Sequence, residues 1–333
     1  MSRSNVTLSD IAERAGVSPA TVSRVLNGDS RVNPARVARI NKVIEELGYA
    51  PNRAARTLAT GRTGLVAAVI DSNLNVFSDP FWGVITTGVS RALQDSNMQA
   101  LLMVRPLNEV DPQVITMLTP GHVDGAIFFQ LHNDDVVRRL QALGLPCVIV
   151  GRPDDAAAFP YVDSDNFGGA EIATTHLIQR GCRTIATIAG NVSLSAGRLR
   201  LDGYRSALSR AGIPVEDSLV HVGDWTDESG ETAMAELLSR RPDIDGVFIA
   251  NDSMAIGALA ALDERGIDIP NQVAVIGFDN MFAGRLGRRQ LTTVQQDVEA
   301  LGATAASMVI EAIQGATPAS VVLPTHLVVR ETA

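Results

Sequence analysis

The chain has 333 residues, of which 46% are hydrophobic and 20% are charged, and its formal net charge at pH 7 is −9. This length suits two or three domains with substantial cores. No apolar run approaches the roughly 20 residues that span a bilayer, and the N-terminal residues are polar, which excludes a membrane protein and an exported one.

The charge is distributed unevenly along the chain. Residues 1–62 carry ten basic and five acidic side chains, a net charge of +5, so the remaining residues carry −14. A small basic segment joined to a large acidic one indicates a module that binds a polyanion, attached to a body with a different task. The same charge could belong to a solvated face, so the local sequence pattern has to decide.

Three short helices are predicted in the first fifty residues. The first begins at Thr7, carries apolar residues at helical spacing and is broken by Gly16. Ser18 is placed to cap a second helix over residues 19–26, which starts with proline. An Asn-Pro pair repeats this signal before a third helix over residues 35–47. Two short helices joined by a glycine-containing turn and braced by a third form a helix-turn-helix unit.

In a helix-turn-helix unit the second helix enters the major groove of DNA. Arg24 can make a bidentate contact with guanine, whereas Pro19 and Ala20 offer apolar contact, for example to a thymine methyl group. The alternative is a plain three-helix bundle with incidental arginines. The residues expected to face the major groove are Pro19, Ala20, Ser23 and Arg24. Short polar side chains suited to phosphate contacts are Thr7, Ser18, Thr21, Asn27 and Asn33.

Four stretches of the first sixty residues carry a family likeness. They are residues 7–12, 15–18, 21–27 and 47–52. Together they resemble the lactose/galactose repressor (LacI/GalR) family of transcriptional regulators. The resemblance favours a DNA-binding head over a plain bundle.

Residues 51–63 are predicted to form a hinge helix. A helix of about two turns is marginal alone in water, so it needs a partner to be ordered. In the family, two such segments from a dimer fold together in the minor groove, and a leucine wedges into the central base step. The resemblance implies that Leu58 is this wedge, that Ala55 lies on the same face, and that Asn52 and Arg56 lie near phosphate. The alternative is an exposed linker that contains one leucine.

From Leu65 onward, apolar strand-like runs alternate with helical stretches, which predicts parallel sheets covered on both faces. The expected strands are residues 65–70, 100–104, 125–129, 147–150, 184–189, 247–250 and 273–278, and two final strands at 321–324 and 326–330 close the two halves. The expected helices include residues 168–180, 195–211 and 253–265. Two successive open sheets place a ligand crevice at the carboxyl ends of their strands.

Polar groups at strand ends make this crevice a candidate binding site. Carboxylates, amides and an arginine around an indole suit a polyhydroxylated ligand, because the polar groups bond its hydroxyls and the ring covers its C–H face. Each residue also has a structural interpretation, as a helix cap or as part of the core. The candidates from this argument are Asp71, Arg152, Arg200, Trp225, Asn251 and Asp279.

The body also resembles the effector domain of the same family, which is similar to periplasmic sugar-binding proteins. The matching stretches are residues 162–163, 168–170, 200–204, 250–252 and 276–279. The resemblance implies effector contacts from Arg200, Asn251, Asp279, Trp225 and Gln296, with Phe81 or Trp82 on the other side. The chain departs from the pattern in a longer stretch at residues 72–78 and in Gly151, where some sugar-responsive members carry an acid.

No catalytic or cofactor-binding motif is recognisable in the body. The sequence has no glycine-rich nucleotide loop, no nucleophile elbow and no paired metal-binding histidines. The two cysteines, Cys147 and Cys182, are far apart in apolar or turn segments, which favours two buried thiols over a disulfide or a metal site. We therefore expect a cytoplasmic protein that is not an enzyme and that needs no cofactor and no metal.

The predicted architecture is an all-α helix-turn-helix head with a hinge helix, followed by an α/β body of two parallel-sheet subdomains like a periplasmic binding protein. The expected boundaries are 1–50 for the head, 51–63 for the hinge and 64–333 for the body. One half of the body is expected at about 64–163 and 294–322, the other at about 164–293 and 323–333.

The predicted function is that of a repressor that binds a pseudo-palindromic operator as a homodimer. A mono- or oligosaccharide in the crevice is expected to control its affinity for DNA, as inducer or as corepressor. A purine, a phosphorylated metabolite or a partner protein could instead be the effector. A solute-binding protein is the alternative from another class, but it needs an export signal and no basic head.

Overall fold

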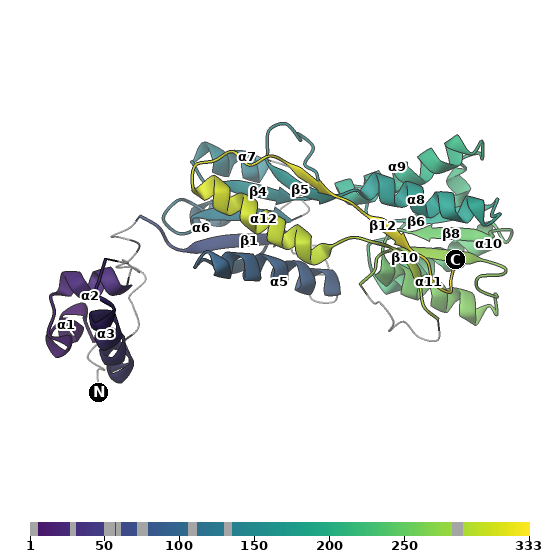
Figure 1. Ribbon diagram of the computed structural model, residues 1–333. Coiled ribbons are helices and arrows are strands. Elements are labelled where there is room, and N and C mark those ends of the chain that lie inside the picture. Colours follow the sequence, from purple (N-terminus) through teal and green to yellow (C-terminus); the bar gives the residue numbers. More distant parts are fainter. Residues whose placement is uncertain are drawn as a thin grey trace. The chain divides into compact units, whose positions relative to one another are not determined.

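The computed structural model describes residues 6–26, 31–49, 57, 61–71, 79–105, 112–129, 135–281 and 289–333. The chain forms two compact units, residues 1–63 and residues 64–333, whose helices and strands are labelled in Figure 1. The predicted hinge segment lies largely outside the described residues. No helix in the described part combines the length and the apolar character that crossing a bilayer requires.

The first unit is the predicted helix-turn-helix bundle. Its helices are α1 at Leu8–Ala15, α2 at Pro19–Leu26 and α3 at Pro34–Leu47. Gly16 and Gly48 end α1 and α3 with φ of 60° and 59°, a left-handed conformation that glycine adopts without steric cost. The buried core consists of Ile11, Ala12, Ala15, Val22, Ile40 and Val43.

The second unit contains two six-stranded sheets, each with helices on both faces, which confirms the predicted α/β body. The strand order of the first sheet is β11-β5-β4-β3-β1-β2, all parallel. Its strands are β1 Leu65–Asp71, β2 Gln99–Arg105, β3 Gly125–Phe129, β4 Cys147–Val150, β5 Tyr161–Ser164 and β11 Val321–Leu323. Helices α5 (Pro80–Asp95) and α12 (Val298–Ile313) pack on one face, and α6 (Pro112–Met117) and α7 (Asp135–Ala142) on the other.

The second sheet repeats this plan. Its strand order is β12-β10-β9-β8-β6-β7, with β12 antiparallel to β10 and the other pairs parallel. The strands are β6 Ile185–Ala189, β7 Val220–Val222, β8 Gly246–Ile249, β9 Ala274–Asp279, β10 Thr292–Gln295 and β12 His326–Val328. Helices α8 (Asn166–Gln179) and α9 (Ser195–Arg210) cover one face; α10 (Asp227–Arg240) and α11 (Asp252–Glu264) cover the other, and a 3-10 turn, η1 (Asp217–Leu219), precedes β7.

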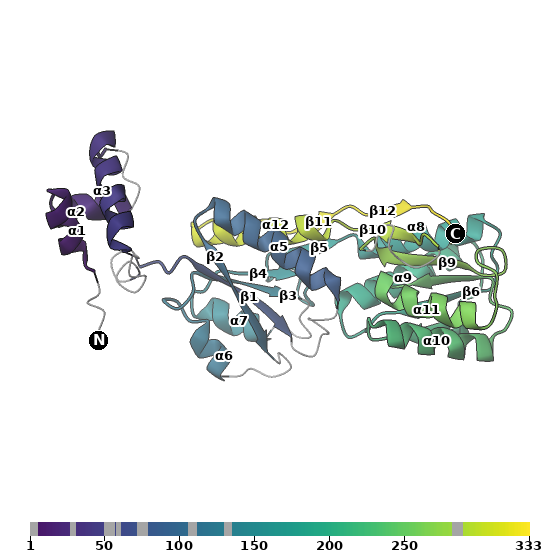
Figure 2. The same ribbon diagram turned by 90° about the horizontal axis from the view of Figure 1, so that it is seen from below.

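The chain passes from one sheet to the other three times, between β5 and α8, between β10 and α12, and between β11 and β12. Figure 2 shows the last of these passages as the yellow segment that carries β11 and β12. The sequence predicts a boundary between the two halves at about residue 294. The structure instead places Val294 and Gln295 in the second half, because they belong to β10, which pairs with β9 and β12 of the second sheet.

Candidate functional site

The outward face of α2 carries the residues predicted for the major groove. Pro19, Ala20 and Arg24 are exposed and Ser23 is half-buried, whereas Val22 is fully buried in the core of the bundle. Because one face of α2 is exposed and the opposite face is buried, the helix can enter a groove of DNA while the core of the bundle stays covered. The predicted contacts Asn27, Asn52, Ala55, Arg56 and Leu58 lie outside the described residues.

Three of the predicted phosphate contacts cap helices. The Thr7 hydroxyl donates to the Asp10 carboxylate at 2.8 Å, and the backbone N–H of Thr7 donates to it at 2.7 Å, which lowers the pKa of Asp10. Ser18 Oγ accepts the N–H of Thr21 at 3.2 Å, and Asn33 Oδ1 accepts the N–H of Ala35 at 2.9 Å. These side chains fix the N-terminal ends of the three helices, where free N–H groups favour phosphate.

In the second unit, Arg200 on α9 lies at the centre of a buried hydrogen-bond network and is only 4% exposed. Its Nε donates to Asn166 Oδ1 at 2.8 Å, and its Nη1 donates to the carbonyl oxygen of Ala250. Nη1 also lies 3.3 Å from Asp279 Oδ1. The guanidinium carbon is 3.6 Å from the centroid of the Phe278 ring, a cation–π contact. Groups of the protein therefore already hold Arg200 in place.

The network also includes residues from two of the passages between the sheets. Gln296 donates from Nε2 to Asp279 Oδ1 at 2.6 Å and accepts at Oε1 from Ser164 Oγ at 2.7 Å. Asp163 Oδ1 accepts the backbone N–H of Ser164 and Nδ2 of Asn166, both at 2.9 Å. Because Ser164 ends β5 and Gln296 directly follows β10, these bonds tie two inter-sheet passages to each other.

Buried carboxyl groups dominate the electrostatics around Arg200. Burial raises the pKa of Asp163 to about 6 and that of Asp252 to about 7. Burial also raises the pKa of Asp279, since it outweighs the attraction of Arg200. Asp252 accepts Thr293 Oγ1 at 2.6 Å and the N–H of Met281 at 3.0 Å. The cost of keeping three carboxylates ionised here is therefore only partly offset by one arginine.

Asn251 and Trp225 lie together beside this network. Asn251 caps α11 by accepting the N–H of Met254 at 2.9 Å, and its Nδ2 donates to the carbonyl oxygen of Trp225 at 3.0 Å. Trp225 has a φ of 77°. Its ring packs on Gly190, where an added Cβ would lie 2.0 Å from a ring carbon. Within the described part of the chain, the buried indole N–H finds no acceptor.

A small cavity of about 30 Å³ brings part of the predicted site together. It is lined by Phe81, Val150, Gly151, Asp163, Asn166, Leu194, Ser195, Ala196, Arg200, Gln296 and Leu301. This volume holds a water or two, whereas small-molecule sites measure roughly 300–1,000 Å³. A sugar therefore requires the two halves of the body to separate.

The predicted effector contacts divide into three groups. Phe81, Arg200 and Gln296 line the cavity. Trp225, Asn251 and Asp279 contact the network around it. The others lie elsewhere: Asp71 is buried at the end of β1, Arg152 is exposed after β4, and Trp82 packs in the core with its ring centroid 6.1 Å from that of Phe129.

Asp163 and Asn166 line the cavity although they were not predicted as contacts. The four-residue strand β5 is short and half polar, so it was not recognised as a strand. Had it been, the rule that ligand groups follow the carboxyl ends of strands would have selected both residues.

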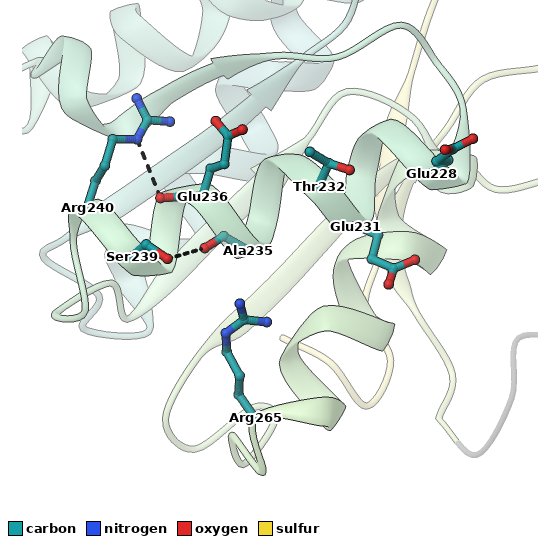
Figure 3. A pocket seen from close by; sticks show the side chains of 8 residues that line it. All are labelled: Glu228, Glu231, Thr232, Ala235, Glu236, Ser239, Arg240 and Arg265. Atoms are coloured by element: carbon teal, nitrogen blue, oxygen red, sulfur yellow. Dashed lines mark hydrogen bonds between the residues drawn. The ribbon is translucent and has the colours of Figure 1, made fainter.

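Two larger hollows lie on outer helix faces. One, of about 640 Å³, lies along α10 with Arg265 on its other side (Figure 3). The other, of about 590 Å³, lies between α8 and α9. Neither contains a predicted effector contact, and both are open to solvent, so the small cavity is the better candidate site. Among the described residues, no three potential metal ligands gather.

Replacing Asp163 with Asn should flatten the dependence of stability on pH. Because burial raises the pKa of Asp163 to about 6, the folded protein binds this proton more tightly than the unfolded chain does. The free energy of unfolding should then fall as pH rises from about 4 to 6, by roughly 3 kcal/mol from this group. Asp163→Asn lacks this decline and keeps both hydrogen bonds to Oδ1. Chemical denaturation at pH 4, 5, 6 and 7 measures it.

Asp202→Asn is the matched control, because its side chain is 56% exposed. Its curve of stability against pH should run parallel to that of the unchanged protein. Parallel curves for Asp163→Asn as well would contradict the assignment of the raised pKa.

Comparison with known proteins gives consistent likenesses for both units. Residues 7–52 match the bacterial regulatory proteins of the lacI family, and residues 174–333 match the periplasmic binding protein-like domain. The chain is 42% identical to the HTH-type transcriptional regulator CelR of Thermobifida fusca, over 99% of this chain and 98% of that protein.

Two solved structures are similar over almost the whole chain. One is a complex of the transcriptional regulator CelR with cellobiose, with 40% identity, a TM-score of 0.76, and coverage of 98% of this chain and 100% of that one. The other is the lac repressor dimer bound to operator and the anti-inducer ONPF, with 27% identity, a TM-score of 0.86, and 98% of each chain covered.

Proposed function

Because this chain belongs to the LacI family of bacterial regulatory proteins, we propose that it is a repressor. Its affinity for the operator would depend on whether a ligand occupies the cleft around Arg200. Membership of this family makes the chain a DNA-binding transcriptional regulator and not an enzyme. The observation that carries the proposal is the pairing of an exposed recognition face on α2 with a buried polar network between two sheets. The cytoplasm is the compartment in which such a regulator meets DNA.

The effector we propose is an uncharged mono- or oligosaccharide. Asp279, Asn251, Gln296 and Arg200 offer acceptors and donors to hydroxyl groups, and the unsatisfied indole N–H of Trp225 offers one more donor. The Trp225 and Phe81 rings can cover the apolar face of a sugar. The solved complex of the relative CelR with cellobiose supports this class.

The proposed mechanism depends on the three inter-sheet passages. A ligand that enters the cleft has to break or replace bonds of the network that ties Ser164 to Gln296. The angle between the two halves should therefore change when a ligand binds. A change in the half that carries β1, which follows the hinge segment, would alter how two hinge segments meet on DNA. Coupling of about 1–3 kcal/mol is the usual scale for such systems.

We propose that the operator-binding form is a homodimer. The edge strand β2 exposes Leu101 (38%) and Leu102 (50%), and apolar edges of this kind are suited to covering by another chain. The solved lac repressor dimer on operator supports a dimeric form. Two heads would then read two half-sites of a pseudo-palindrome.

An unbiased selection of double-stranded DNA, followed by calorimetry with mono- and disaccharides, tests the proposal. We expect one enriched palindromic sequence, and an affinity for it that changes when a sugar binds. A sugar that weakens operator binding is an inducer, and one that strengthens it is a corepressor. Failure to enrich any sequence, with and without sugars, would overturn the proposal.

Replacing Arg24 with Ala should weaken operator binding by roughly 1–3 kcal/mol and relax the preference at one base pair. The physical reason is the loss of a bidentate contact to guanine from an exposed residue of α2. Titrations against operators with each base pair substituted in turn measure both effects. Arg36→Ala, an exposed arginine on α3, is the control: a phosphate contact there would weaken all sequences equally. If Arg24→Ala weakened binding to all of these operators equally, base recognition by Arg24 would be excluded.

A further inference from the structure

Asp163 lines the cavity, and one of its two carboxylate oxygens has no hydrogen-bond donor among the described residues. Its Oδ1 accepts from the Ser164 N–H and from Asn166 Nδ2, and no other described residue donates to Oδ2. The residue lines the cavity and is 7% exposed. Oδ2 is not among the fully buried polar atoms that lack a partner, so it stays accessible, and an accessible carboxylate oxygen can accept a ligand hydroxyl.

The single positive charge that lines the cavity is shared between more than one carboxyl group. Asp163 and Arg200 are its two ionisable residues, and Arg200 is already paired with Asp279 at 3.3 Å. Nη1 and Nε of Arg200 are also engaged by Ala250 and Asn166. Arg200 also acts on Asp163 through its charge, so one guanidinium serves Asp279 and Asp163 together and compensates the negative charge of Asp163 only in part.

Asp252, whose ionised form burial disfavours and the charge of Arg330 partly stabilises, adds to this negative field from behind the network. It is 2% exposed, and its partners Thr293 Oγ1 and the N–H of Met281 are neutral. Arg152, which is exposed after β4, is the other arginine that acts on Asp163, and it acts through its charge without an ion pair. An exposed arginine is screened by water and salt and compensates a buried carboxylate only weakly.

From this geometry we infer that the site accepts an uncharged sugar and rejects its phosphorylated form, and that Asp163 determines this selectivity. The inference rests on the proposed sugar effector. A hydroxyl of a neutral sugar donates to Asp163 Oδ2. A phosphate group would lose its hydration and meet a carboxylate in a site of low dielectric, where like charges repel strongly.

Calorimetry with cellobiose and cellobiose 6-phosphate tests the inference on the full-length protein. We expect the unchanged protein to bind cellobiose at least about a hundredfold more tightly than the phosphorylated sugar. In Asp163→Asn this ratio should fall at least about tenfold, through tighter binding of the phosphorylated sugar. Asp163→Ser, which removes the same charge with a smaller side chain, should shift the ratio in the same direction. Thermal unfolding and operator binding show whether each variant is folded.

Asp202→Asn is the matched control, because it removes one carboxylate from an exposed position of α9. It should leave the ratio within about twofold of that of the unchanged protein. An equal affinity for both sugars, or a ratio that neither Asp163 variant changes, would overturn the inference while leaving the sugar effector intact. If none of a panel of neutral sugars binds, the sugar effector fails and this inference fails with it.

Discussion

Replacing Arg200 with Met should lower the free energy of unfolding of the second unit by about 3–5 kcal/mol and abolish effector binding. Breaking a buried ion pair from one side leaves the other charge uncompensated, which is the costly case. In Arg200→Met the Asp279 carboxylate, Asn166 Oδ1 and the carbonyl of Ala250 would each lose a donor. Denaturant titration measures the stability, and calorimetry with the sugar measures the binding.

Arg198→Met is the matched control for this prediction. Arg198 lies on the same helix, two residues earlier, and pairs with Asp154 at 2.9 Å with its side chain 43% exposed. Exposed ion pairs contribute about 0–1 kcal/mol, so this variant should lose no more than that. If both variants lost the same stability, the buried network would not have the central role described for it.

Replacing Gly302 with Ala should destabilise the first half of the body by about 3 kcal/mol. Gly302 lies where α12 crosses α5, and an added Cβ would stand 2.1 Å from the carbonyl oxygen of Ile85. The same restriction applies on α5, where a Cβ added at Gly88 would lie 2.1 Å from the carbonyl oxygen of Glu299. Because the obstructing atoms belong to the backbone, the methyl group can be accommodated only if the two helices move apart. Denaturant titration again measures the loss.

Gly83→Ala is the control, because no atom lies within 4 Å of an added Cβ at that position of α5. Alanine favours a helix over glycine by about 1 kcal/mol, so this variant should be neutral or more stable. Equal destabilisation by Gly83→Ala and Gly302→Ala would show that close helix packing is not the cause.

The head could be predicted almost completely from the sequence because its signals are local. Ser18, Asn33 and the glycines that follow α1 and α3 act within a few residues of their own positions. The structure confirms all three helices, with α3 beginning at Pro34, one residue earlier than predicted. Their DNA contacts stay predictions.

The cleft could be predicted only in part, because its partners are distant in sequence. Arg200 meets Asp279 and Ala250 through tertiary packing that no local pattern encodes. Strands β5 and β10 are short and rich in polar residues, so the sequence pattern did not reveal them, and Asp163 was missed with β5. Trp82 and Phe81 are neighbours on one helix and both pack in the core, and only packing decides that Phe81 also lines the cavity.

The interleaved path of the chain between the two sheets has a consequence for its synthesis on the ribosome. Five of the six strands of the first sheet are translated early, but α12, which covers one of its faces together with α5, follows after the last parallel strand of the second sheet. Until the later part of the chain has emerged, the strands made first therefore have one apolar face that α5 covers only in part. A nascent chain stalled before residue 298 should for this reason be the form that most needs a chaperone.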